Sequence, residues 1–371
     1  MKTPSQILPD WESSLLNSAQ QVQDLSLTIP LWVEKRGPHS EIVFSTRIRL
    51  ARNLAKHFFP SSAPAAELTT VSDEVCAAVS KSGALTQPTF VEMDYLAQLD
   101  RLVLVERRLA SPALADRKGS ARIILGAGEY ASIMTNEEDH LRLQSFQSGL
   151  SVRAAWQKLE RIDEELSNHL DYAFSQQLGF LTACPTNTGT GMRVSVLVHL
   201  PALVLLDQMG KTSRKFAKLG LTIRGFFGEG TEVIGNVFQI SNQLTLGCSE
   251  DDTLGLIEQV AEQLIELEQK ARAQLLADKK LNLEDKVWRI YGVLRYARSL
   301  SSGEFLNFLS LIRLGLDLKI LTGWSETLLQ ELMLVTQPGH MQKWHKASRV
   351  TEKRDKLRAD IVKNKLKLTG Q

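Results

Sequence analysis

Five arginines in short polar motifs could together hold a polyphosphate. They are Arg47 and Arg49 in Ser-Thr-Arg-Ile-Arg, Arg142 after an acidic run, Arg193 after Gly-Thr-Gly-Met, and Arg224 before Gly-Phe-Phe-Gly. The planar guanidinium binds two phosphate oxygens at once and keeps its charge at any physiological pH. A single arginine of this kind is more often a solvated surface residue, so the spacing alone leaves both interpretations open.

Carboxylates occur close to two of these arginines. Glu137, Glu138 and Asp139 precede His140 and follow an apolar run, 131–134, that is typical of a strand. Taken alone, such a charge cluster is typical of a solvated helix start. Glu229 lies between two glycines, and by itself it would be a loop carboxylate in a flexible turn.

Four segments, 45–49, 135–142, 184–193 and 223–230, occur in an order that resembles the phosphagen kinases, the ATP:guanidino phosphotransferases. Within that family the chain is most similar to the bacterial protein-arginine kinases, and the similarity covers roughly residues 41–267. It implies that the five arginines bind ATP. The residues that the resemblance assigns to ATP are Ser45, Thr46, Arg47, Ile48, Arg49, Arg108, Arg142, Arg193, Val194, Ser195, Val196, Leu197, Arg224, Gly225, Phe226, Phe227, Gly228 and Glu229.

The resemblance also assigns the catalytic residues. A guanidinium has no free lone pair, and carboxylates can grip its fork, orient one nitrogen and accept its proton. Glu138 and Glu229 match the two catalytic glutamates, and Cys184 matches a cysteine beside the reactive guanidine. A thiolate among arginines would have a lowered pKa, whereas a buried apolar cysteine is the ordinary alternative. Mg²⁺ is expected with ATP, held by phosphates and water, so we assign it no protein ligand.

Two positions depart from the family pattern. Arg108 stands where related sequences usually have a histidine near the nucleotide, and Phe226-Phe227 is bulkier than usual. His140 and His199 have no partner at metal-ligand spacing, and we interpret both as structural residues.

The C-terminal tail carries a second motif. Residues 343–371 hold ten Lys or Arg against three Asp or Glu, and Arg354-Asp355-Lys356-Leu357-Arg358-Ala359 matches an RDxxRA motif. In protein-arginine kinases this motif implies allosteric binding of phosphoarginine by Arg354, Asp355, Arg358 and Ala359. Arg354 and Arg358 are four residues apart, so one helix face would present both to a phosphate. Without the motif, they would be a solvated basic face.

The element pattern predicts an α+β fold, with an antiparallel sheet flanked by helices and an all-helical C-terminal domain. We expect an N-terminal extension at 1–40, a phosphagen-kinase-like catalytic domain at 41–270 and a helical domain at 271–371. Predicted strands include 42–45, 101–105, 121–125 and 194–199, and 232–246 is predicted to be a hairpin. Predicted helices cover 254–276, 283–300, 302–320, 325–335 and 351–368.

Composition and charge limit the partners and the cellular compartment that we expect for this protein. The net charge of +2 disfavours a nucleic-acid binder, and three widely spaced cysteines in 371 residues favour a reducing compartment. The start lacks the apolar core of a signal peptide, and the longest apolar run, 194–206, is too short to span a bilayer. We therefore expect a cytoplasmic protein without membrane or nucleic-acid partners.

The sequence favours arginine in proteins as the substrate. Free-guanidine kinases carry a helical domain ahead of the Ser-Thr-Arg motif, whereas about 40 residues precede Ser45 here. The alternatives are a kinase for free arginine or another small guanidine, and a catalytically silent phosphoarginine-binding adaptor. The resemblance further implies a homodimer, protein substrates with accessible arginines, a zinc-binding activator protein and a Clp-type protease that degrades the marked proteins.

Overall fold

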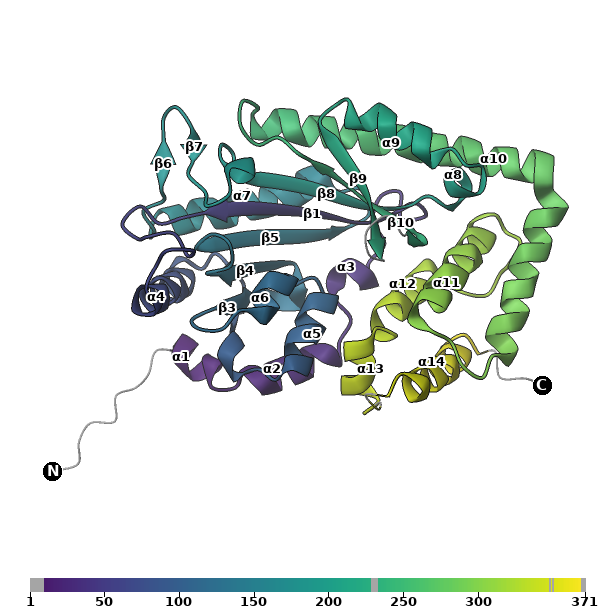
Figure 1. Ribbon diagram of the computed structural model, residues 1–371, viewed down its shortest axis with the longest axis horizontal. Coiled ribbons are helices and arrows are strands. Elements are labelled where there is room, and N and C mark those ends of the chain that lie inside the picture. Colours follow the sequence, from purple (N-terminus) through teal and green to yellow (C-terminus); the bar gives the residue numbers. More distant parts are fainter. Residues whose placement is uncertain (1–9, 228–232, 347, 349, 368–371) are drawn as a thin grey trace.

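A twisted antiparallel sheet forms the centre of the molecule (Figure 1). The computed structural model describes residues 10–227, 233–346, 348 and 350–367. Within these ranges the sheet has eight strands in the order β2-β3-β4-β5-β1-β8-β10-β9. Their bounds are β1 Val43–Arg52, β2 Thr89–Glu92, β3 Arg122–Leu125, β4 Ala131–Thr135, β5 Leu141–Ser148, β8 Met192–His199, β9 Leu221–Phe227 and β10 Ile234–Asn242. A small hairpin of β6 (Phe174–Ser175) and β7 (Gly179–Phe180) stands apart from it.

The two faces of the sheet differ because side chains alternate along each strand. Ile48 and Leu50 of β1 and Val194 and Val196 of β8 are fully buried in the main core, which α7 (Val152–Ser167) helps to cover. Arg47 and Arg49 of β1 and Arg193 and Ser195 of β8 alternate with these residues and lie on the opposite face. The sheet thus buries one face and uses the other for chemistry.

Helices before the C-terminal region surround the strands. They are α1 Asp10–Leu15, α2 Ser18–Ser26, α3 Leu31–Glu34, α4 Ala65–Ser82, α5 Gln98–Glu106, α6 Pro112–Asp116, α8 Pro201–Leu205 and α9 Met209–Ala217, with α7 as above. The described part of the N-terminal extension is docked, since Trp32 stacks on Phe146 of β5 with ring centroids 6.0 Å apart.

One predicted strand and the predicted hairpin were wrong. Residues 101–105 lie in helix α5, where Asp100, Val103 and Leu104 form the buried face at helical spacing. The predicted hairpin within 232–246 is a single strand, β10, which pairs with β9 earlier in the chain. The strands predicted at 42–45, 121–125 and 194–199 are confirmed.

The C-terminal region is helical wherever it is described, as predicted. Helix α10 (Glu250–Tyr296) runs for 47 residues with a break in helical geometry at Lys279. It is followed by α11 Ser302–Asp317, α12 Glu326–Val335, α13 Pro338–Trp344 and α14 Thr351–Lys365. The predicted boundary at 270/271 falls inside α10, and it stays a prediction. Among the described residues, no helix combines the length and apolar character that a membrane crossing requires.

Three arginines, Arg52, Arg107 and Arg358, are among the largest fully buried side chains. Arg52 pairs with Asp163 at 2.7 Å, and Arg107 pairs with the buried Glu129. A buried guanidinium requires such partners, because removal of one would leave an uncompensated charge.

Candidate functional site

The register of β1 and β8 aligns the predicted phosphate-binding residues in rows. Arg49 lies opposite Arg193, Arg47 opposite Ser195, and Ser45 opposite Leu197. Arginines therefore occupy one end of the polar face, and the row of Ser45 and Leu197 lies at the other end. We call Arg47, Arg49, Arg142, Arg193 and Arg224 the arginine cage.

The cage concentrates positive charge with few internal partners. Burial and then the neighbouring arginines lower the pKa of Arg47 and of Arg49 well below the usual value. The Nε atoms of Arg47, Arg49 and Arg193 have no hydrogen-bond partner among the described residues. Like charges held together at partly buried positions are unfavourable unless an anion joins them. The arrangement is that of a polyanion site.

The acidic turn, residues 136–140, borders the cage. It connects β4 to β5, so it is a turn and not the start of a helix. Glu137 forms a salt bridge with Arg142 and is nearly buried. Glu138 is different, because 43% of its side chain is exposed. Its Oε2 accepts hydrogen bonds from Asn187 Nδ2 at 3.2 Å and Arg142 Nη2 at 3.4 Å. Glu138 is therefore the carboxylate of the turn that a ligand can reach.

The other two residues of the turn position it. Asp139 Oδ1 accepts hydrogen bonds from Asn53 Nδ2 and from the backbone N–H of Ala183, both at 2.6 Å. This last bond ties the turn to the loop that carries Cys184. His140 Nδ1 accepts from the backbone N–H of Leu54, and its Nε2 lies 3.0 Å from the carbonyl of Phe58, so the ring is neutral. Burial lowers the pKa of His140 to about 4, consistent with the predicted structural role.

Cys184 begins a short loop that reaches the cage. Its Sγ lies 3.0 Å from Thr186 Oγ1. Burial and the neighbouring Arg142 and Arg224 lower the pKa of Arg193, and the nearby Cys184 and Glu138 partly offset that lowering. The loop requires glycine at position 189 (φ 112°), because a Cβ there would lie 2.2 Å from the carbonyl oxygen of Thr245. The loop and the acidic turn thus bring the Cys184 thiol and the Glu138 carboxylate near the same arginine, Arg193.

The remaining predicted nucleotide residues have different surroundings. Arg224 is exposed on β9, two strands from β8 in the sheet. Gly225 lies opposite Phe238 of β10. The backbone of Phe227 ends β9, and Gly228 and Glu229 lie outside the described residues. The geometry at the second predicted catalytic glutamate therefore stays a prediction.

Four predicted ATP residues turn their side chains away from the polar face, and their contact with ATP stays a prediction. Ile48, Val194 and Val196 are fully buried in the main core, and Thr46 donates its hydroxyl hydrogen bond to the carbonyl of Gly149 at 2.7 Å. Residues adjacent to Arg47, Arg193 and Ser195 must point to the opposite face of a strand. Only their backbone can border a nucleotide.

Arg108, which replaces the usual histidine, lies at the far end of the polar face. Its Nη1 donates to Ser45 Oγ at 2.9 Å, and its guanidinium carbon lies 5.0 Å from the ring centre of Phe226. Burial and the nearby Arg49 lower the pKa of Arg108. The structure therefore brings Arg108 and Ser45 together, and it places Phe226 against them.

The tail motif divides into two environments, and its binding of phosphoarginine stays a prediction. Arg358 is fully buried and donates to the backbone carbonyls of Leu300 (2.7 Å) and Thr336 (3.2 Å) and to Asp355 Oδ1 (2.6 Å). Asp355 thus accepts a bond from within the motif, and Ala359 packs in the core. Both arginines share a helix face, but Arg358 is enclosed by the residues that follow α12 and precede α11.

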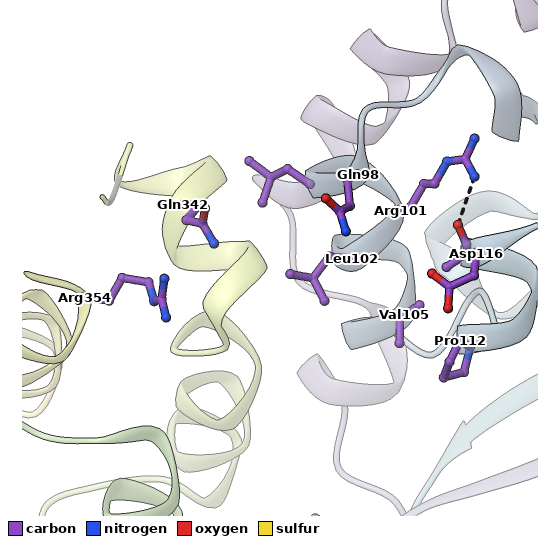
Figure 2. A pocket seen from close by; sticks show the side chains of 10 residues that line it. Gln98, Arg101, Leu102, Val105, Pro112, Asp116, Gln342 and Arg354 are labelled. Atoms are coloured by element: carbon purple, nitrogen blue, oxygen red, sulfur yellow. Dashed lines mark hydrogen bonds between the residues drawn. The ribbon is translucent and has the colours of Figure 1, made fainter. Parts of the chain in front are cut away.

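Arg354 instead lines a cavity of about 420 Å³, the tail pocket, between the catalytic and helical regions. Figure 2 shows Arg354 and Gln342 approaching from α14 and α13, while Gln98, Leu102 and Asp116 approach from α5 and α6. The pocket has the Arg354 guanidinium on one wall, and the Asp116 carboxylate and the Arg101 guanidinium on the other.

Sequence reasoning missed Asn187 and underused Asp139. Asn187 stands inside the Cys-Pro-Thr-Asn motif, so its signal was present, but its contact with Glu138 depends on how the loop folds. Within the described ranges, no group of three or more His, Cys, Asp or Glu side chains could hold a metal ion.

Comparisons with known proteins identify the family of this chain. The profile of the ATP:guanido phosphotransferase C-terminal catalytic domain matches residues 70–271, and that of the protein-arginine kinase McsB C-terminal domain matches 280–371. The protein-arginine kinase of Halothermothrix orenii is 43% identical over 91% of this chain and 96% of its own length. That of Brevibacillus brevis is 43% identical over 91% and 95%.

Solved structures show the same catalytic fold. A lombricine kinase crystal structure matches with a TM-score of 0.56 at 28% identity, over 67% of this chain and 72% of its own. The duplicated taurocyamine kinase of Schistosoma mansoni, with bound transition-state analogue components, matches with a TM-score of 0.54 at 28% identity. That match covers 61% of this chain and 32% of the other.

Proposed function

Because this chain belongs to the ATP:guanido phosphotransferase family and, within it, to the protein-arginine kinases, we propose that its arginine cage and acidic turn transfer the γ-phosphoryl group of ATP to arginine side chains in proteins. One observation carries this proposal. The exposed carboxylate of Glu138 lies at the arginine end of the polar face, beside Arg142, Asn187 and the Cys184 loop.

The cage binds and orients the triphosphate. Phosphoryl transfer leaves little covalent work for the protein, so catalysis depends on positioning and on neutralising charge at the phosphate oxygens. Arg49 and Arg193, paired across two strands, supply fixed positive charge without needing to reorganise. Mg²⁺, bound by the phosphates and water, supplies further neutralisation of the nucleotide.

Glu138 and Glu229 act on the acceptor. One guanidinium nitrogen of the substrate arginine forms a bond to the γ-phosphorus, the bond from that phosphorus to the β,γ-bridging oxygen breaks, and ADP leaves. A carboxylate accepts the proton that the attacking nitrogen gives up. Glu138 is suited to this step because Asn187 and Arg142 fix its Oε2 while the rest of the side chain stays accessible. Cys184 assists by orienting the guanidinium electrostatically.

The tail pocket binds phosphoarginine as an allosteric signal. Arg354 contacts the phosphoryl group, and Asp116 on the opposite wall is placed to accept the guanidinium end. Arg358, Asp355 and Ala359 support the pocket by fixing α14 against the domain. We further propose a cytoplasmic homodimer that marks proteins for a Clp-type protease and responds to a zinc-binding activator protein.

The substrate is tested by mass spectrometry under conditions that preserve the acid-labile P–N bond. With ATP, an unfolded protein should acquire phosphoarginine, and free arginine should be a much poorer acceptor. Phosphorylation of free arginine alone would support the small-guanidine alternative. Absence of ADP release with either acceptor would support the silent adaptor.

The allosteric site is tested by calorimetry with phosphoarginine. Arg354→Ala should abolish binding, because it removes the charge-assisted bonds to the phosphoryl group. Lys356→Ala, an exposed neighbour on the same helix, is the matched control and should bind normally. Unchanged affinity for phosphoarginine in Arg354→Ala would show that α14 is a basic helix without this binding site.

A further inference from the structure

The helical C-terminal region forms one wall of a cavity at the far end of the polar face. This base pocket has a volume of about 250 Å³. Arg108, Leu197 and Phe226 line it from the catalytic domain, and Gln330, Met333 and Gln337 line it from α12 and the residues that follow. The pocket therefore brings together residues, such as Arg108 and Gln337, that lie about 230 positions apart in the sequence.

The sheet register puts this pocket at the correct distance from the cage. From the row of Arg49 and Arg193 to the row of Ser45 and Leu197 is four residues along β1. A strand rises about 3.3 Å per residue, so the rows are about 13 Å apart. An extended nucleoside triphosphate spans a comparable length between its terminal phosphates and its base. A nucleotide whose phosphates occupy the cage would thus place its base near Leu197.

The chemistry of the pocket suits a purine. Most of its lining is apolar or aromatic, and the Arg108 guanidinium lies 5.0 Å from the ring centre of Phe226 and 5.6 Å from that of Trp32. Planar bases stack on aromatic rings and on guanidinium planes. The indole Nε1 of Trp32 and the Nε of Arg108 are buried and have no hydrogen-bond partner among the described residues. Both are donors that a heterocyclic base could satisfy.

Helix α12 is held firmly in this position. Gln330 Nε2 donates to the carbonyl of Phe44 at 3.2 Å, and Arg358 Nε donates to the carbonyl of Thr336 at the end of the helix. Met333 and Phe226 both pack against a small cluster of Phe44, Leu197 and Val237. The helix is a fixed wall with Met333 directed at the catalytic domain.

We propose that α12 is the base-side wall of the nucleotide site and that Met333 sets the depth of the pocket that receives the adenine. This inference rests on the proposed function, since it takes ATP as the phosphoryl donor. It adds a specificity-determining residue from outside the catalytic domain. It also links nucleotide affinity to the docking of the helical region.

The test compares two ligands by calorimetry on the full chain. ADP uses both the cage and the base pocket, whereas inorganic tripolyphosphate uses the cage alone. Met333→Trp should fill the pocket and weaken ADP binding at least tenfold, with tripolyphosphate affinity within twofold of wild type. Met333→Ala, which removes contact without blocking the pocket, should weaken ADP binding about threefold or more. Glu331→Ala, at a position of α12 that pairs with Lys365, is the control and should bind both ligands normally.

Unchanged ADP affinity in both Met333 variants would overturn the proposal. If Met333→Trp bound neither ADP nor tripolyphosphate, the substitution would have displaced the helical region. The ADP affinity of Met333→Ala would then decide whether the proposal holds. A loss of ADP affinity alone in Met333→Ala would then support the proposal, and normal ADP affinity would overturn it. The proposed function fails separately, if wild-type protein binds ADP but transfers no phosphate to protein arginine.

Discussion

Replacement of Glu138 by Gln isolates the charge of the accessible carboxylate. Its Oε2 accepts hydrogen bonds from Asn187 Nδ2 at 3.2 Å and from Arg142 Nη2 at 3.4 Å, and a glutamine amide oxygen can accept both. The turn should therefore keep its shape. What is lost is the negative charge that grips the guanidinium and the basicity that accepts its proton. We expect kcat to fall at least about a hundredfold, equivalent to about 2.7 kcal/mol in the barrier.

The assay is the initial rate of ADP release with an unfolded protein substrate, measured over a range of ATP concentrations. The KM for ATP should change little in Glu138→Gln, because the cage stays intact. Glu137→Gln is the matched control, since Glu137 is the buried partner of Arg142 and no ligand contact is assigned to it. That control should raise the KM for ATP more than it lowers kcat. Near-normal kcat in Glu138→Gln would refute the catalytic assignment, and a rise in KM equal to the control's would show that Glu138 acts only through Arg142.

The remaining predictions concern stability. Tripolyphosphate at about 100 times its Kd should stabilise the fold by about 2.7 kcal/mol in thermal unfolding, because it neutralises the arginine cage, and added salt should weaken its binding. Asp139→Ala should cost about 1–3 kcal/mol in urea unfolding, because it removes the oxygen that accepts from the N–H groups of Asn53 and Ala183. Asp139→Asn, whose amide oxygen can accept both bonds, is the control and should cost less; unchanged stability in Asp139→Ala would contradict that bonding. Burial lowers the pKa of His140 to about 4, from an ordinary value of about 6.5. Below pH 6.5 the unfolded chain therefore binds more protons than the folded chain, and the free energy of unfolding should fall by about 3 kcal/mol as the pH drops from about 6.5 to 4. The variant His140→Gln should lack this pH dependence.

The arrangement of arginines at the phosphate end of the site could be predicted because it depends on residues close together in the sequence. Arginines two residues apart on a strand share a face, and Arg47 and Arg49 do so. The acidic turn and the Cys184 loop were likewise placed beside the cage by short motifs. Glu229 stays a prediction, since it lies outside the described residues.

Other features depended on tertiary packing. The run of Leu and Val at 102–105 has strand propensity, yet a helix buries Val103 and Leu104 on one side and leaves Leu102 facing the tail pocket. Helical spacing alone predicted that Arg354 and Arg358 would both face a phosphate. In the structure, the packing of α14 encloses Arg358 and leaves Arg354 at the tail pocket. Nothing in the sequence around Met333 distinguishes it from an ordinary residue of an amphipathic helix.

The buried arginines have a consequence for an enzyme whose substrate is arginine. Such an enzyme carries arginines of its own, and the side chains of Arg36 and Arg289 are 65% and 76% exposed. Arg52, Arg107 and Arg358 hold the fold together through contacts that a phosphoryl group would break. Because these three side chains are enclosed, the folded state shields them from the protein's own activity, and only unfolded copies expose them as substrates.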